Sequence, residues 1–197
     1  MTQRETTEFI KSLRSGERAA IETLVREHVA AMRSVARRLL GHETGVNDVV
    51  RDAFLAAFRG LANSPEAALL GTWLNRIVIS SALMRLRSHA KAEEDVTPEL
   101  LPRFEPNGAF STAQAPWPPD SSTPTMSAET RHSVRACIDS LPDRLRTALV
   151  LRDIEGLASG ELAQQLGTSA DEARGRVHRA RQALRTLLDQ AREEGAR

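Results

Sequence analysis

The stretch from residue 157 to residue 181, LASGELAQQLGTSADEARGRVHRAR, predicts two helices joined by a tight turn. Gly167 stands where the chain must turn with a positive φ, a conformation that glycine adopts without strain. Ser169 and Glu172 have the spacing of a capping box, so the second helix is expected to begin there. Its apolar residues recur every three or four positions and predict one inward stripe. The stripe consists of Ala173, Val177, Ala180, Leu184 and Leu187.

The second helix of this pair is rich in arginine and forms the first candidate site. With Val177 inward, a turn of about 100° per residue directs His178 and Arg179 outward. In a helix-turn-helix, the second helix enters the major groove of DNA, where arginine bonds to phosphates and base edges. A solvated, arginine-rich helix that closes a bundle is the plainer alternative. The candidate DNA-binding residues are Arg174, Gly175, Arg176, His178, Arg179 and Arg181.

The composition favours an all-α protein without an enzyme's site. Aromatic residues make up 4% of the chain and Tyr is absent. The single cysteine, Cys137, allows neither an intrachain disulfide nor a cysteine-based metal site, which indicates a reducing compartment, and we expect a cytoplasmic location. No signal peptide and no long apolar run is present, so we expect no membrane insertion. The five histidines are scattered and no glycine-rich phosphate loop occurs, so neither catalysis nor a cofactor is expected.

The charges divide the chain into three parts, although the net charge is only +1. Lys and Arg number 14 against 9 Asp and Glu in residues 1–91, 1 against 7 in residues 92–130, and 12 against 10 in residues 131–197. Seven of the nine prolines lie between Pro98 and Pro124. This pattern predicts two helical domains joined by a Pro-rich acidic linker, the C-terminal domain being the helix-turn-helix. The predicted boundaries are 1–91, 92–128 and 129–197.

The apolar periodicity predicts further helices in both domains. In the N-terminal domain, Asn47 is the expected cap of a helix that ends at Arg59, and Thr72 is the expected cap of one from Trp73 to Ser88. In the C-terminal domain, Pro142 is expected at the first position of a helix that ends at Ile154. The remaining predicted helices cover 7–14, 17–40 and 129–140, and a loop is expected over 60–71.

Two faces of the N-terminal helices are further candidates. Asp48, Asp52 and Arg59 share the face opposite Phe54 and Phe58, with Arg51 at its edge; a solvated helix face is the usual alternative. A second stripe consists of Trp73, Arg76, Ser80, Met84 and Arg87. An aromatic ring with arginines and a hydroxyl suits phosphate binding and base stacking. From the residues alone, a partly buried tryptophan beside ordinary exposed arginines is the favoured explanation of this stripe.

Two sets of motifs, in this order, resemble the extracytoplasmic-function (ECF) sigma factors of bacterial RNA polymerase. NDVVRDAFLAAF at 47–58, TWLNRI at 72–77 and ALMRLR at 82–87 are similar to the family's second conserved region. IDSLP at 138–142, VLRDIEGL at 150–157 and HRAR at 178–181 are similar to its fourth region. The resemblance covers about residues 20–90 and 133–190, and the absence of the first and third regions is typical of the ECF group.

The resemblance implies a protein that binds core RNA polymerase and directs promoter recognition, DNA melting and transcription initiation. It implies that Asp48, Arg51 and Asp52 bind the clamp of the β′ subunit. It further implies that the fourth region binds the β flap and reads the −35 element through the six candidate residues of the second helix, and that an anti-sigma factor is a partner. The residues implied at the −10 element are Asn63, Trp73, Arg76, Ser80 and Arg87.

Two alternatives remain at this point. A stand-alone helix-turn-helix regulator would bind DNA by itself, but the motifs at 47–87 argue against it because such a regulator needs no second block of this kind. A sigma-like interaction protein would titrate an anti-sigma factor without binding DNA. The basic face at 174–181 argues against that alternative.

Overall fold

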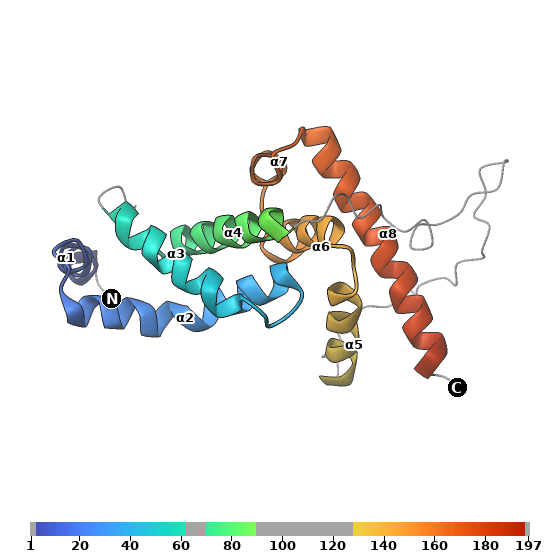
Figure 1. Ribbon diagram of the computed structural model, residues 1–197, viewed down its shortest axis with the longest axis horizontal. Helices are drawn as coiled ribbons and strands as arrows, with labels where there is room; N and C mark the ends of the chain where they lie inside the picture. The colour runs from blue at the N-terminus through green and yellow to red at the C-terminus, as the bar shows by residue number, and fades with distance from the viewer. Residues whose placement is uncertain (1–2, 62–69, 90–127, 196–197) are drawn as a thin grey trace. The chain divides into compact units, whose positions relative to one another are not determined.

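The computed structural model describes residues 3–61, 70–89 and 128–195, and all regular structure within them is helical (Figure 1). This confirms the all-α prediction. The chain divides into two compact units, Met1–Ala90 and Lys91–Arg197. The predicted linker, 92–128, lies outside the described residues except for Ala128, which begins a helix.

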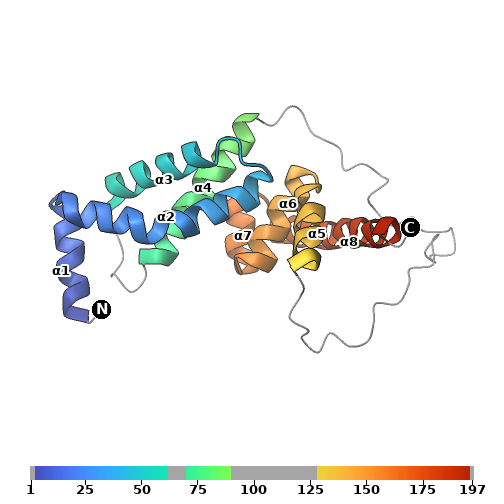
Figure 2. The ribbon, with the colours of Figure 1, turned by 90° about the horizontal axis from the view of Figure 1, so that it is seen from below.

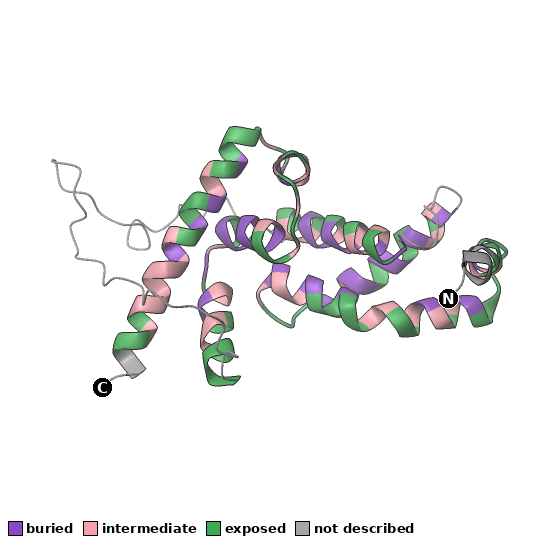
Figure 3. Ribbon diagram, turned by 180° about the vertical axis from the view of Figure 1, so that it is seen from behind, coloured by how far each residue is buried: buried purple, intermediate pink, exposed green. Residues whose placement is uncertain are grey.

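The first unit consists of α1 (Gln3–Arg14), α2 (Arg18–Leu40), α3 (Val46–Gly60) and α4 (Leu70–His89). Helices α2, α3 and α4 pack against one another, and Figure 2 shows them side by side. Each turns an apolar face to the others, as the buried positions in Figure 3 show. Burial of these faces supplies the main stabilising term for such a bundle. Fully buried core residues include Leu24, Met32, Leu39, Val49, Leu74 and Val78.

The boundaries of α2 agree with the prediction, whereas two predicted caps were wrong. Gly41 ends α2 with φ 75°, and its N–H donates to the Arg37 carbonyl. Helix α3 begins at Val46, with Gly45 (φ 82°) at the cap position, so Asn47 lies within the first turn. Asn47 Oδ1 instead accepts a hydrogen bond from Arg33 (2.7 Å). Thr72 is not a cap either, because α4 begins at Leu70.

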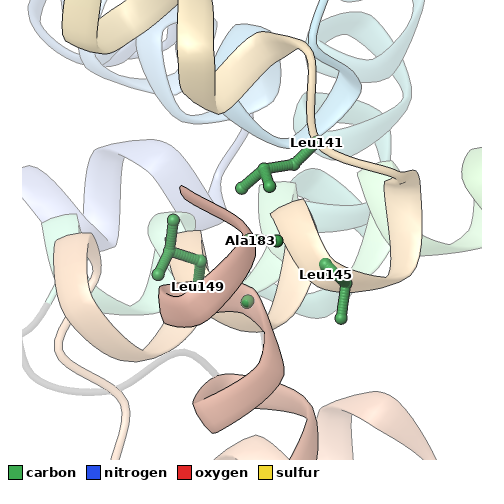
Figure 4. Close-up of a cluster of buried hydrophobic side chains, with 5 residues drawn as sticks. Leu141, Leu145, Leu149 and Ala183 are labelled. Carbon is green, nitrogen blue, oxygen red and sulfur yellow. The ribbon is translucent and has the colours of Figure 1, made fainter. Parts of the chain in front are cut away.

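The second unit consists of α5 (Ala128–Asp139), α6 (Asp143–Leu149), the π-helix η4 (Val150–Ile154), α7 (Ser159–Leu166) and α8 (Ala170–Gly195). Figure 4 shows Leu141, Leu145, Leu149 and Ala183 of its core. Of the predicted inward stripe on α8, the first three residues are buried and the last two are half-buried against this core. The stripe prediction is confirmed.

The turn between α5 and α6 is held by a buried arginine. Arg146 is 4% exposed, and its guanidinium donates to the carbonyls of Asp139 (3.3 Å) and Leu141 (2.9 Å) and to the Asp143 carboxylate. Pro142 occupies the cap position of α6, not its first helical position as predicted. Cys137 is buried nearby, and this burial raises the pKa of its thiol, as suits a small apolar residue of the core.

The predicted helix ending at Ile154 ends there, but its last turn is a π turn. The Glu155 N–H donates to the Val150 carbonyl five residues earlier (2.9 Å), and the Leu157 N–H donates to Leu151 (3.0 Å). Gly156, with φ 73°, then turns the chain towards α7. The apolar spacing could not reveal this wider turn, because the α and π registers diverge over only a few residues.

Candidate nucleic-acid interface

Helices α7 and α8 form a helix-turn-helix around a left-handed glycine. Gly167 has φ 65°, and the Thr168 N–H donates to the Ala163 carbonyl (3.0 Å), which closes the end of α7. The Glu172 N–H then donates to Ser169 Oγ (3.2 Å) at the start of α8. The predicted turn and the serine cap are therefore confirmed (Figure 1).

The side chain of Glu172 does not complete a capping box with Ser169. Its carboxylate accepts hydrogen bonds from the Thr168 hydroxyl and from Arg176. These two bonds lower the pKa of Glu172 and keep it charged, and the bond from Thr168 has the larger effect. The Arg176 side chain is consequently only 18% exposed and lies along its own helix.

Some of the other candidate residues of α8 form ion pairs with carboxylates of the same chain, and others are exposed without such a pair. Arg174 forms an ion pair with Asp171 one turn earlier. Arg181 donates two hydrogen bonds to Asp153 of η4. His178 and Arg179 are exposed.

Gly175 lies beside these exposed residues. A Cβ at this position would meet only the Arg179 guanidinium, at 3.6 Å. Gly175, His178 and Arg179 therefore form an open surface on which a ligand can approach the helix backbone closely.

Helix α4 presents the predicted stripe largely to solvent. Trp73 is half-buried, whereas Arg76, Ser80 and Arg87 are exposed. Met84 lies among them with 68% of its surface exposed, the highest value among the exposed large apolar residues of the described chain. Asn63, the remaining candidate for this surface, lies outside the described residues.

Helix α3 carries the predicted charged face. Arg51 and Asp52 are exposed, and Asp48 is half-buried. Arg51 Nη2 lies 3.5 Å from Asp48 Oδ1, and Arg51 Nε lies 3.6 Å from Asp52 Oδ1. Arg85 of α4 reaches the other oxygen of Asp48 (3.8 Å). Phe54 is buried in the core, and its ring stacks with that of the half-buried Phe58, with centroids 6.2 Å apart.

One residue of this face was missed by the sequence reasoning. Leu55 is 47% exposed. Its spacing from Asp48, Asp52 and Arg59 is that of one helix face. Single exposed apolar side chains are common on protein surfaces, so the available signal was the place of this leucine within a row of charged candidate positions. Among the described residues, no helix is long and apolar enough to cross a bilayer, and no cluster of potential metal ligands occurs.

Two family models match the chain in separate segments. The Sigma-70 region 2 model matches residues 24–92, which include α3 and α4. The model for Sigma-70, region 4 matches residues 131–184, which include the helix-turn-helix.

Relatives match over nearly the whole chain. RNA polymerase sigma-H factor of Pseudomonas aeruginosa is 29% identical over 190 residues, which cover 95% of this chain and 96% of that protein. ECF RNA polymerase sigma factor SigM of Mycobacterium tuberculosis is 30% identical over 191 residues, which cover 94% of this chain and 86% of that protein. ECF RNA polymerase sigma-E factor of Escherichia coli is 29% identical over 178 residues, which cover 89% of this chain and 90% of that protein.

Two solved structures are also similar. CnrH, in complex with the cytosolic domain of CnrY, is 26% identical with a TM-score of 0.52 over 94% of this chain and 97% of that chain. The sigma factor RpoE, in complex with the anti-sigma factor NepR from Bartonella quintana, has the same TM-score at 20% identity over 85% and 96%, a likeness of fold alone. Given both sigma-70 regions in order and relatives such as SigM, this chain belongs to the ECF family of RNA polymerase sigma factors and acts in promoter recognition.

Proposed function

We propose that this sigma factor binds the β′ clamp of core RNA polymerase through α3, contacts the −10 element through α4 and reads the −35 element through α8. The observation that carries the proposal is the open surface of Gly175, His178 and Arg179 on the second helix of the helix-turn-helix. A helix of this kind reads base edges in the major groove, and arginine bonds to guanine there in a bidentate manner.

The polymerase contact is supported by the mixed character of the α3 face. Asp48, Arg51 and Asp52 offer charged groups, and Leu55 adds an apolar side chain at its centre. Protein interfaces combine an apolar centre with a polar rim in this way. The β flap is the corresponding proposed partner of the second unit.

The −10 contact is supported by the exposed stripe on α4. Arg76 and Arg87 can neutralise phosphates, and Ser80 can donate a hydrogen bond to one. Trp73 offers a ring on which an unpaired base can stack. An anti-sigma factor is a further proposed partner, in line with the two similar solved structures. In these, CnrH is bound to the cytosolic domain of CnrY, and the sigma factor RpoE is bound to the anti-sigma factor NepR.

We expect the free chain to bind promoter DNA weakly and core polymerase to raise specific binding strongly. Three of the candidate arginines of α8 are already paired with carboxylates, and the net charge is +1, so few counterions are released from DNA. Core polymerase holds both units on one partner and makes the second DNA contact intramolecular. Fluorescence anisotropy of labelled promoter DNA, with the chain alone, core alone and both together, measures this. Nanomolar specific binding by the free chain at physiological salt would instead indicate a stand-alone regulator.

A further inference from the structure

The ion pair between Arg181 and Asp153 joins α8 to η4, the turn that precedes α7. Arg181 Nε donates to Asp153 Oδ2 (2.9 Å), and its Nη2 donates to Oδ1 (2.6 Å). The two residues are 28 positions apart, on α8 and on η4. A guanidinium that meets a carboxylate with two parallel bonds fixes the relative orientation of the two groups, which a lysine could not do.

The position of Arg181 on α8 differs from that of the open residues. At about 100° per residue, Arg181 lies about 40° from Val177 around the helix axis, whereas Arg179 lies about 160° from it. Val177 is buried. Arg181 therefore lies on the flank of α8 next to its buried stripe, where Asp153 is within reach, and Arg179 lies on the opposite side. The hydrogen bonds that Arg181 donates to Asp153 also raise the pKa of Arg181 and hold it in the charged form.

Asp153 itself lies on the π turn. The hydrogen bond from the Glu155 N–H to Val150 spans five residues instead of four. Such a turn is wider than an α turn and changes the directions of the side chains on it. The two hydrogen bonds from Arg181 thus connect α8 to the π turn η4. This turn lies directly before the loop that leads to α7.

We propose that Arg181 is a positioning residue and not a DNA contact: with Asp153 it sets the orientation of α8, and so the register in which His178 and Arg179 meet the −35 element. This inference rests on the proposed function. The two side chains are 58% and 33% exposed, so the pair contributes little to folding stability. Its effect is therefore expected in recognition of DNA.

The test is a double-mutant cycle with a charge swap, read out in reconstituted holoenzyme. The variants are Asp153→Ala, Arg181→Ala, the double alanine variant, and Asp153→Arg combined with Arg181→Asp. Arg192→Ala is the matched control, because Arg192 is an exposed arginine in the last turn of the same helix. Each holoenzyme transcribes a promoter library with a randomised −35 element, and the preference among −35 sequences, its salt dependence and the thermal unfolding of each sigma variant are measured.

We expect each single variant to lose about fivefold in its preference for the best −35 sequences. This factor corresponds to the upper end of the interaction energies of exposed ion pairs. The double alanine variant should lose no more than either single variant, and the charge swap should restore most of the preference. The salt slope should stay unchanged in Arg181→Ala, since no phosphate contact is removed, and the midpoint of thermal unfolding should change little. Arg192→Ala should behave as the wild type.

Two results would overturn the inference. If Asp153→Ala left transcription unchanged or raised it while Arg181→Ala lowered it on all promoters and reduced the salt slope by about 1, Arg181 would be a phosphate contact. If the swap failed to restore preference although the swapped protein folds, the pair would not position α8. A wild-type holoenzyme without any −35 preference would contradict the proposed function itself, and is thereby distinguishable from both.

Discussion

Leu55→Asp is expected to weaken assembly of the sigma factor with core polymerase by about 30-fold or more. Truncation of one of the few side chains that dominate an interface weakens binding by about 2 kcal/mol or more, which corresponds to about 30-fold in affinity. The aspartate would, in addition, bring an unpaired charge into a surface that loses its water on binding. Leu55 is 47% exposed in the free chain, and α3 is held in the core by other residues, among them Val50, Ala53 and Ala57, so the helix should remain folded.

The measurement is a competition assay for core polymerase against unlabelled wild-type sigma factor, with circular dichroism of each variant. Ala30→Asp is the matched control, because Ala30 is exposed on α2 and receives the same acidic side chain. Asp52→Arg should weaken assembly in the same direction, since it reverses a charge beside Leu55 on the same face. Unchanged core affinity in both Leu55→Asp and Asp52→Arg would show that α3 is not the polymerase contact.

Arg179→Ala is expected to lower transcription and to relax base preference at one position of the −35 element. A guanidinium bonded to guanine O6 and N7 contributes about 1–3 kcal/mol of discrimination, which corresponds to about 5- to 150-fold at that position. Arg179 is exposed on the side of α8 opposite Val177, and its guanidinium lies beside Gly175. It is not held by a carboxylate in the way that Arg174 and Arg181 are.

The readout is transcription by holoenzyme from a library of −35 variants, with Arg192→Ala as the control for loss of an arginine from α8. A flattened preference at one position identifies a base contact. An equal loss on every library member would show that Arg179 touches only phosphate, and the assignment of base reading to it would then be wrong.

The fold could be predicted largely from local signals in the sequence. Gly167 and Ser169 lie within three residues of one another and define the turn and the new helix by themselves. The inward stripe of α8 follows from its periodicity. By contrast, Gly45 displaced the expected cap at Asn47, since the space beside Gly45 is filled by Arg85 of a helix 40 residues further on. Such a contact leaves no trace in the local pattern.

The state of Arg181 could not be predicted for the same reason. The sequence places Arg174, Arg176, Arg179 and Arg181 within eight residues and makes them look equivalent. The structure shows that three have carboxylate partners and that the partner of Arg181 is 28 residues away. The partners of Arg174 and Arg176 stand one turn earlier on α8, at Asp171 and Glu172, where local spacing offers them. The partner of Arg181 lies on η4 and is visible only in the structure.

Transcription by reconstituted holoenzyme from genomic DNA of the source organism, with every start site mapped, tests the central claim most directly. If this chain directs promoter recognition, it should concentrate initiation at defined start sites that share a −35 and a −10 element, whereas core polymerase alone should start without preference. Variants of these sites with either element scrambled serve as controls. Start sites that remain as scattered as those of core polymerase alone, although the chain binds core, would contradict the account.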